Sequence, residues 1–115
     1  MKIYFKKKKI EIPVKGVSIY STGLILRTRN APNLFFERVS KNPSLTAFFV
    51  FFPFLVLWLD DKKRVVDFRI AKPFQFKIDS KKPFSSIVEI PLNSKNIKFF
   101  NFFVGKKDVK SLLRR

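Results

Sequence analysis

Apolar side chains recur at every second position in four short stretches of this chain. The stretches are residues 10–14, 66–70, 74–78 and 88–92, and polar or charged residues fill most of the positions between. A period of two is typical of a strand that buries one face and exposes the other. The sequence therefore predicts a fold built mainly from half-buried strands.

Residues 48–59 lack any polar face until the segment ends at Asp60. A strand without a polar face is typical of a position covered on both sides, so we expect this segment at the centre of the fold. Pro53 lies within it, and proline has no N–H to donate to a central ladder. We therefore expect a bend or bulge to divide the segment at Pro53.

Turn-forming residues separate these runs. Residues 60–63 are all charged and lie between two apolar stretches, which predicts a hairpin with a charged tip, and residues 30–33, 41–43 and 80–83 predict further loops. Many short strands joined by such turns favour a sandwich or a barrel. Near the C-terminus Val109, Leu112 and Leu113 have helical spacing, but so short a helix is marginal without a partner.

The length and apolar content set the scale of the fold. A chain of 115 residues has room for one core, and its 46% apolar and 17% aromatic content is ample to fill it. We therefore expect a mainly β, compact single domain over residues 1–115, a β-sandwich or barrel of short antiparallel strands. Residues 1–9 would form a basic N-terminal strand or arm, and residues 106–115 a short basic C-terminal helix or tail.

Several motifs, taken in order, resemble one known family. They are Thr22-Gly23-Leu24-Ile25-Leu26-Arg27, Phe49-Val50-Phe51-Phe52-Pro53, Leu57-Trp58-Leu59-Asp60 with Arg64-Val65-Val66-Asp67, the turns Lys72-Pro73 and Lys81-Lys82-Pro83, and Val88-Glu89-Ile90-Pro91. Over residues 16–106 the chain resembles the uncharacterised family catalogued as domain of unknown function 192, in particular its archaeal members. The resemblance implies a compact β-sandwich or barrel and an archaeal, thermophilic source.

The chain departs from that family where the family carries acidic residues or glycine. Leu55 stands where an Asp is usual, Asn93 where a Gly is usual, and Lys106 where an Asp follows the late glycine. These departures put any inherited activity in doubt, and they count against an enzyme or small-ligand domain. A scaffold with fewer acids and more bases favours a polyanionic partner.

The charge balance points in the same direction. Lys and Arg total 25 against 8 Asp and Glu, which gives a formal net charge of +17. Size scaling gives a surface of roughly 6,600 Å², or about one uncompensated positive charge per 400 Å². AT-rich coding would favour Glu as readily as Lys, so codon bias does not explain the shortage of acids. A surface of this kind repels itself unless a polyanion neutralises it.

The residues that most enzymes use for catalysis are scarce. The chain contains neither Cys nor His and has only three Gly, which excludes disulfides, thiolate or imidazole metal sites and a Gly-rich phosphate loop. Asp60 and Asp61 are adjacent in a predicted turn and suit a structural role there. Glu89 is expected to point outward from its strand, next to lysines. A Ser–Lys arrangement remains conceivable, but we expect no enzyme, no metal and no cofactor.

Basic residues form clusters on the predicted turns and near both ends of the chain. Lysine and arginine on such segments can reach phosphate oxygens without reading bases. The candidate RNA-binding residues are Lys6, Lys7, Lys8, Lys9, Arg27, Arg29, Arg38, Lys62, Lys63, Arg64, Lys81, Lys82, Lys106, Lys107, Lys110, Arg114 and Arg115.

The 16 phenylalanines mostly fall on the inward side of the alternation, which favours core packing. The exceptions are Phe99, Phe100, Phe102 and Phe103, where apolar residues flank Asn101 on both sides. We expect these four to be candidates for stacking on unpaired bases or for docking on a neighbouring protein.

The function that this pattern favours is that of a non-catalytic, structural RNA-binding protein, and we expect a ribosomal protein. Its expected partners are rRNA and neighbouring ribosomal proteins, without a small-molecule substrate. The alternatives are a general DNA- or RNA-binding protein, associated with chromatin or tRNA, and a peripheral protein on anionic membranes.

Lysines 6–9 have no apolar stretch of signal-peptide type behind them, and the longest apolar run, residues 47–59, is too short for a bilayer span. We therefore expect a soluble, cytoplasmic, ribosome-associated protein.

Overall fold

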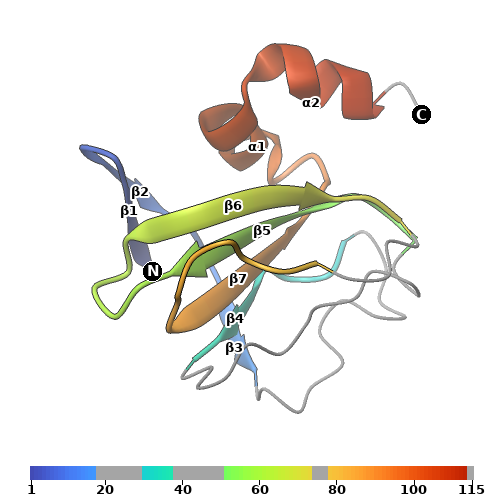
Figure 1. Ribbon diagram of the computed structural model, residues 1–115. Helices are drawn as coiled ribbons and strands as arrows, with labels where there is room; N and C mark the ends of the chain where they lie inside the picture. The colour runs from blue at the N-terminus through green and yellow to red at the C-terminus, as the bar shows by residue number, and fades with distance from the viewer. Residues whose placement is uncertain (18–29, 38–50, 74–77, 114–115) are drawn as a thin grey trace.

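A five-stranded sheet forms the centre of the structure (Figure 1). The computed structural model describes residues 1–17, 30–37, 51–73 and 78–113. The sheet has the order β3-β4-β7-β5-β6, and β1 and β2 form a separate hairpin. The strands are β1 (Lys2–Phe5), β2 (Lys8–Glu11), β3 (Lys15–Val17), β4 (Leu34–Phe36), β5 (Phe54–Leu59), β6 (Val65–Ala71) and β7 (Ser86–Pro91), and the helices are α1 (Ile97–Val104) and α2 (Lys106–Leu113). The predicted mainly β domain with a C-terminal helix is confirmed.

Strand β5 lies between β7 and β6 and is antiparallel to both. All six of its residues are buried, as expected for an apolar segment without a polar face. Pro53 immediately precedes the strand, and its carbonyl accepts a hydrogen bond of 2.9 Å from the Leu92 N–H. The predicted central position is therefore confirmed for the described part of the segment, whereas residues 48–50, on the other side of Pro53, lie outside the described residues.

Three of the four alternating stretches lie within the described residues, and each overlaps a strand. Residues 66–70 fall within β6 and residues 88–91 within β7, whereas β2 covers only the first part of the stretch 10–14. The stretch 74–78 lies outside the described residues apart from Ile78, which is buried. One pair departs from the antiparallel expectation, because β3 runs parallel to β4.

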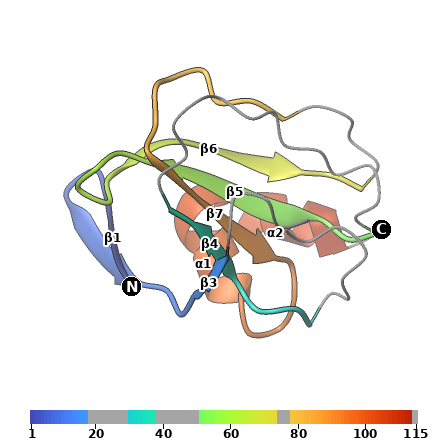
Figure 2. The ribbon, with the colours of Figure 1, turned by 90° about the horizontal axis from the view of Figure 1, so that it is seen from below.

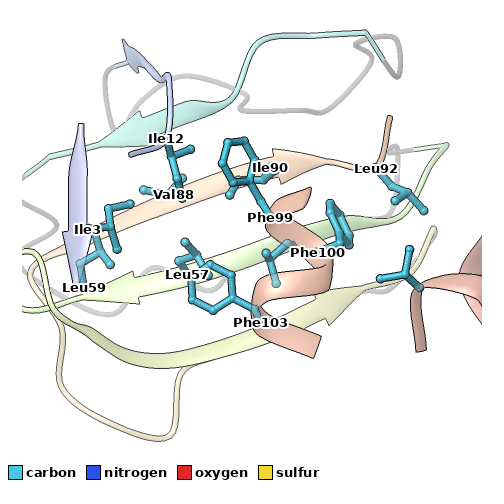
Figure 3. Close-up of a cluster of buried hydrophobic side chains, with 12 residues drawn as sticks. Ile3, Ile12, Leu57, Leu59, Val88, Ile90, Leu92, Phe99, Phe100 and Phe103 are labelled. Carbon is cyan, nitrogen blue, oxygen red and sulfur yellow. The ribbon is translucent and has the colours of Figure 1, made fainter. Parts of the chain in front are cut away.

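The sheet buries apolar side chains on both of its faces. Phe54, Val56 and Trp58 of β5 belong to the cluster on one face, and Leu55, Leu57 and Leu59 belong to the cluster on the other. The second face is covered by α1, which inserts Phe99, Phe100 and Phe103 between Leu57, Ile90 and Leu92 (Figure 3). Seen from the face of the sheet that the helices do not cover, both helices lie behind the sheet (Figure 2).

The position of α1 corrects the prediction made for the late phenylalanines. Phe99, Phe100 and Phe103 are buried, so they are core residues, and only Phe102 among the four is half-buried. Apolar residues on both sides of Asn101 look like a strand exposed on two faces. In a helix the same residues form one wide apolar stripe, which the sheet covers.

The position of Glu89 is a second correction. Its exposed fraction is 4%, so it does not point into solvent as predicted. Strand β7 lies between β4 and β5, and Glu89 is opposite Leu34 on one side and Val56 on the other. Alternation indicates only which face a residue occupies, and in this sheet both faces are covered.

Helix α2 follows α1 after Gly105, whose φ of 89° suits a residue without Cβ. It contacts the core through Val109, its buried residue, while most of its other described side chains are exposed. No helix in the described part of the chain is long and apolar enough to cross a membrane.

Candidate nucleic-acid interface

The β1–β2 hairpin carries the four-lysine run. Phe5 pairs with Lys8, so Lys6 and Lys7 form a two-residue turn. Lys6, Lys7, Lys8 and Lys9 are all exposed, and Lys6 has a φ of 56°. A left-handed conformation costs a residue with a Cβ roughly 1–2 kcal/mol, so glycine would be favoured at this position on backbone grounds. The hairpin thus presents a lysine where local stability favours glycine.

The other end of the same hairpin is held by an ion pair. The N-terminal ammonium group donates hydrogen bonds of 2.9 Å to Glu11 Oε1 and to the Ile12 carbonyl. The hydrogen bond from this ammonium group lowers the pKa of the exposed Glu11 carboxyl. Glu11 is therefore engaged at the base of the hairpin, away from the lysines at the tip.

The β5–β6 turn is organised by Asp60. Its Oδ1 accepts hydrogen bonds from the backbone N–H groups of Lys62 (2.9 Å) and Arg64 (2.8 Å), and its Oδ2 accepts one from Arg64 Nε (2.7 Å). Partial burial alone would raise the pKa of Asp60, but these hydrogen bonds outweigh it and lower the pKa. The sequence predicted that the adjacent Asp60 and Asp61 have a structural role in a turn, and this prediction is confirmed for Asp60.

Lys63 occupies the left-handed position of this second turn, with a φ of 62°. Its Nζ lies 5.0 Å from the centre of the Phe35 ring, and the side chain is half-buried. Of the three basic residues here, Arg64 is paired with Asp60 and Lys63 is half-buried, so Lys62 is the one most available to a partner.

The third basic segment is the turn before β7. The Lys81 N–H donates to Asp67 Oδ2 (2.9 Å), and the Lys82 N–H donates to Ser80 Oγ (3.0 Å), which in turn donates to the Lys82 carbonyl (2.7 Å). These bonds fix the backbone and leave both ammonium groups exposed. The turn is therefore rigid at its backbone and basic at its surface.

Backbone hydrogen bonds hold the β1–β2 hairpin against the β5–β6 turn and the residues before β7 against the end of β5. The Tyr4 N–H donates to the Lys63 carbonyl (3.0 Å), and the Ser85 N–H donates to the Leu59 carbonyl (2.7 Å). Figure 1 shows the β1–β2 hairpin and the β5–β6 turn on the same side of the molecule. We call this surface the basic end. It consists of Lys6–Lys9, Lys62–Arg64 and Lys81–Lys82.

The remaining predicted residues lie on α2 or outside the described residues. Leu112 and Leu113 of α2 line a small pocket with Phe51, Pro53 and Pro73, which places the C-terminal end of this helix at the opposite end of the sheet. Lys106, Lys107 and Lys110 of α2 are exposed. The other predicted residues, Arg27, Arg29, Arg38, Arg114 and Arg115, lie outside the described residues.

A further basic hollow was missed at the sequence level. A cavity of about 480 Å³ beside β3 and the start of α1 is lined in part by Lys15, Lys95 and Lys98. Asn33 and Asn96 form its base and hydrogen-bond each other reciprocally, at 2.9 and 3.2 Å. Lys95 and Lys98 are close in the sequence but not adjacent, and Lys15 is far from both, so no run of basic residues marks the hollow.

Comparison with known proteins extends the description of the fold. No family model matches the chain, and no curated protein matches it. A crystal structure of a protein of unknown function from Novosphingobium aromaticivorans is similar, with a TM-score of 0.67 and 13% sequence identity, over 84% of this chain and 74% of that one. At this identity the similarity shows a shared fold alone, and the resemblance to domain of unknown function 192 stays a prediction.

Proposed function

We propose that this protein is a non-catalytic RNA-binding protein that contacts RNA phosphates through the basic end, and that its partner is the ribosome. The observation that carries the proposal is the assembly of three basic segments, far apart in sequence, at one end of the sheet. Phosphate contacts supply most of the affinity of sequence-independent nucleic-acid binding.

The local acids support this reading. Asp60 and Asp67 accept hydrogen bonds from the turns that carry the lysines, so they shape the basic end more than they neutralise it. Within the described residues, the ion pairs of these segments involve Arg64, while Lys6, Lys7 and Lys8 have no carboxylate within ion-pair distance.

The two left-handed lysines give independent support. Lys6 and Lys63 stand in the two hairpin turns of the basic end at positions that favour glycine. Backbone strain kept at such positions is typical of residues retained for function. A positive side chain at both turns is consistent with a role in contacting phosphates.

The ribosome is the proposed partner because the net charge of +17 favours a permanent polyanion. Folded RNA can be bound by shape and phosphates, without reading of bases. The resemblance to domain of unknown function 192 is compatible with this use, because the chain lacks two acids that are usual there and has Lys106 at one of the two positions.

Sedimentation of cell lysate through a sucrose gradient tests the proposal. We expect the protein to migrate with one ribosomal subunit in low salt and to be released by a high-salt wash. With about six phosphate contacts, affinity for RNA should fall by roughly 10³-fold between about 50 and 200 mM salt. A protein that stays at the top of the gradient in low salt would contradict the ribosomal assignment, and salt-independent RNA binding would contradict the phosphate interface.

A further inference from the structure

A hollow of about 450 Å³ lies between the tip of the β1–β2 hairpin and α1. Its walls are the rings of Phe5 and Phe102 and the side chains of Lys6, Lys7 and Lys8. It combines two half-buried aromatic rings from separate elements with three exposed lysines. Its volume falls within the range of about 300–1,000 Å³ that is common for small-ligand pockets.

The two rings are held in place by neighbours in the core. Phe5 packs edge-on against Phe68, with ring centres 5.5 Å apart, and Phe102 packs edge-on against Phe103 at 5.0 Å. Phe5 and Phe102 are themselves 6.1 Å apart at an angle of 62°. The two rings therefore form a fixed apolar wall of the hollow, and their side chains have little conformational freedom to lose when a ligand binds.

The lysines give the rim a single sign of charge. Lys6 Nζ lies 5.3 Å from the centre of the Phe5 ring, and Lys7 and Lys8 are exposed beside it. An aromatic wall with ammonium groups at the rim suits a ligand that has a flat, uncharged ring and negative charges next to it. A nucleotide has this composition, with a base that can stack and phosphates on either side.

We propose that this hollow binds an unpaired nucleotide of RNA, with its base against Phe5 and Phe102 and its adjoining phosphates on Lys6–Lys8. The proposal rests on the proposed RNA-binding function and adds to it a preference for single-stranded over paired segments. Bases in a duplex are stacked on each other and present no free face.

An anionic membrane is the competing partner for a basic, aromatic surface. Membrane insertion requires apolar side chains that protrude, whereas Phe5 and Phe102 are half-buried walls of a concave site. The large apolar residues that are exposed in the described part of the chain are Tyr4, Phe51 and Leu113, none of which lines this hollow. The geometry thus favours a base over a lipid chain.

The test measures binding of the full chain to labelled oligo(U), to a blunt RNA duplex and to vesicles of phosphatidylserine and phosphatidylcholine. The variant Phe102→Leu keeps apolar volume and removes the ring. The matched control is Phe84→Leu, because Phe84 is also half-buried but packs against Trp58 on the opposite face. Thermal melting establishes that both variants are folded, and Phe102→Trp restores an aromatic ring.

We expect Phe102→Leu to weaken oligo(U) binding by about tenfold and to leave duplex binding within about twofold, with Phe102→Trp close to the native protein. The salt dependence should be unchanged, because no phosphate contact is lost. Fluorescence of 2-aminopurine placed in the oligonucleotide should be quenched by the native protein and much less by Phe102→Leu.

The other outcomes separate the two proposals. If Phe102→Leu and Phe84→Leu bind oligo(U) equally well while RNA binding persists, the nucleotide site is wrong and the proposed function stands. If neither RNA is bound at low salt, both proposals fail. If Phe102→Leu weakens vesicle binding and not RNA binding, the hollow serves a membrane and the nucleotide site is overturned.

Discussion

The two ends of the sheet both carry lysines, but they hold them differently. At the basic end, the lysines lie on turns whose backbones are fixed by Asp60, Asp67 and Ser80 and by the bond between Tyr4 and Lys63. At the opposite end, the lysines of α2 lie on an eight-residue helix that contacts the core through Val109.

This difference matters for binding a polyanion. A surface whose backbone is fixed before binding loses little conformational freedom when the partner binds. The basic end also brings together charges from three places in the sequence, while the charges of α2 come from one. We therefore expect most of the RNA affinity to come from the basic end, although α2 also carries three exposed lysines.

The largest expected effect is the loss of RNA affinity when three lysines of the basic end are replaced. The triple variant Lys7→Gln, Lys62→Gln and Lys81→Gln takes one exposed lysine from each segment of the basic end. Each lost phosphate contact costs about fivefold in affinity near physiological salt, so we expect a loss of about 100-fold. Anisotropy with a labelled RNA hairpin measures it.

The matched control is Lys106→Gln, Lys107→Gln and Lys110→Gln, which removes the same charge from the opposite end. Screening over about 8 Å at physiological salt should limit its effect to less than about tenfold. Equal losses in the two triple variants would show that net charge, and not the assembled basic end, determines affinity.

An intermediate effect is expected at Asp60. Asp60→Asn keeps the shape of the side chain but removes the charge that accepts three hydrogen bonds in the β5–β6 turn. We expect the free energy of unfolding to fall by about 1–2 kcal/mol at neutral pH. Urea denaturation measures this, with Asp61→Asn, an exposed neighbour, as the control.

The same residue predicts a pH dependence. The pKa of Asp60 in the folded protein lies below its ordinary value of 3.8, so its stabilisation is fully present above about pH 5. It is lost as the pH falls through 3.8 towards the lower folded pKa. The difference in stability between the native protein and Asp60→Asn should therefore shrink below about pH 4, and a constant difference down to pH 2 would contradict the assigned cause.

The smallest expected effect is a change in the free energy of unfolding when the left-handed lysine of either hairpin turn is replaced by glycine. Replacing Lys6 or Lys63 by Gly relieves a left-handed backbone, and we expect each change to raise the free energy of unfolding by about 0.5 kcal/mol. Lys8→Gly, within strand β2, should lower it by up to about 1 kcal/mol. If Lys6→Gly is also destabilising, the strain argument for functional lysines fails.

Local patterns were sufficient for much of the fold because the relevant signals are short-range. The uninterrupted apolar run predicted the buried β5, and the charged residues 60–63 predicted the turn that Asp60 organises. The spacing of Val109, Leu112 and Leu113 predicted α2. In each case the side chains of the segment itself determine whether it forms a buried strand, a turn or a helix.

The errors arose where a pattern has two solutions. Phe99–Phe103 are compatible with an exposed strand or a helix, and the adjacent apolar face of the sheet selects the helix. Glu89 alternates like an outward residue, but β7 became an interior strand with both faces covered. The parallel pairing of β3 with β4 likewise depends on the path of the chain and not on either strand's composition.

For the candidate site, the sequence by itself determined the composition: a large excess of lysine over acid, neither Cys nor His, and basic turns. Only the tertiary structure decided which lysines act together. It brought three segments to one end and placed α2 at the other, and it set Phe5 beside Phe102, nearly one hundred positions away in the chain. The physical reason is that charge and hydropathy are properties of single residues, whereas proximity depends on how the strands pair and on which face the helices cover.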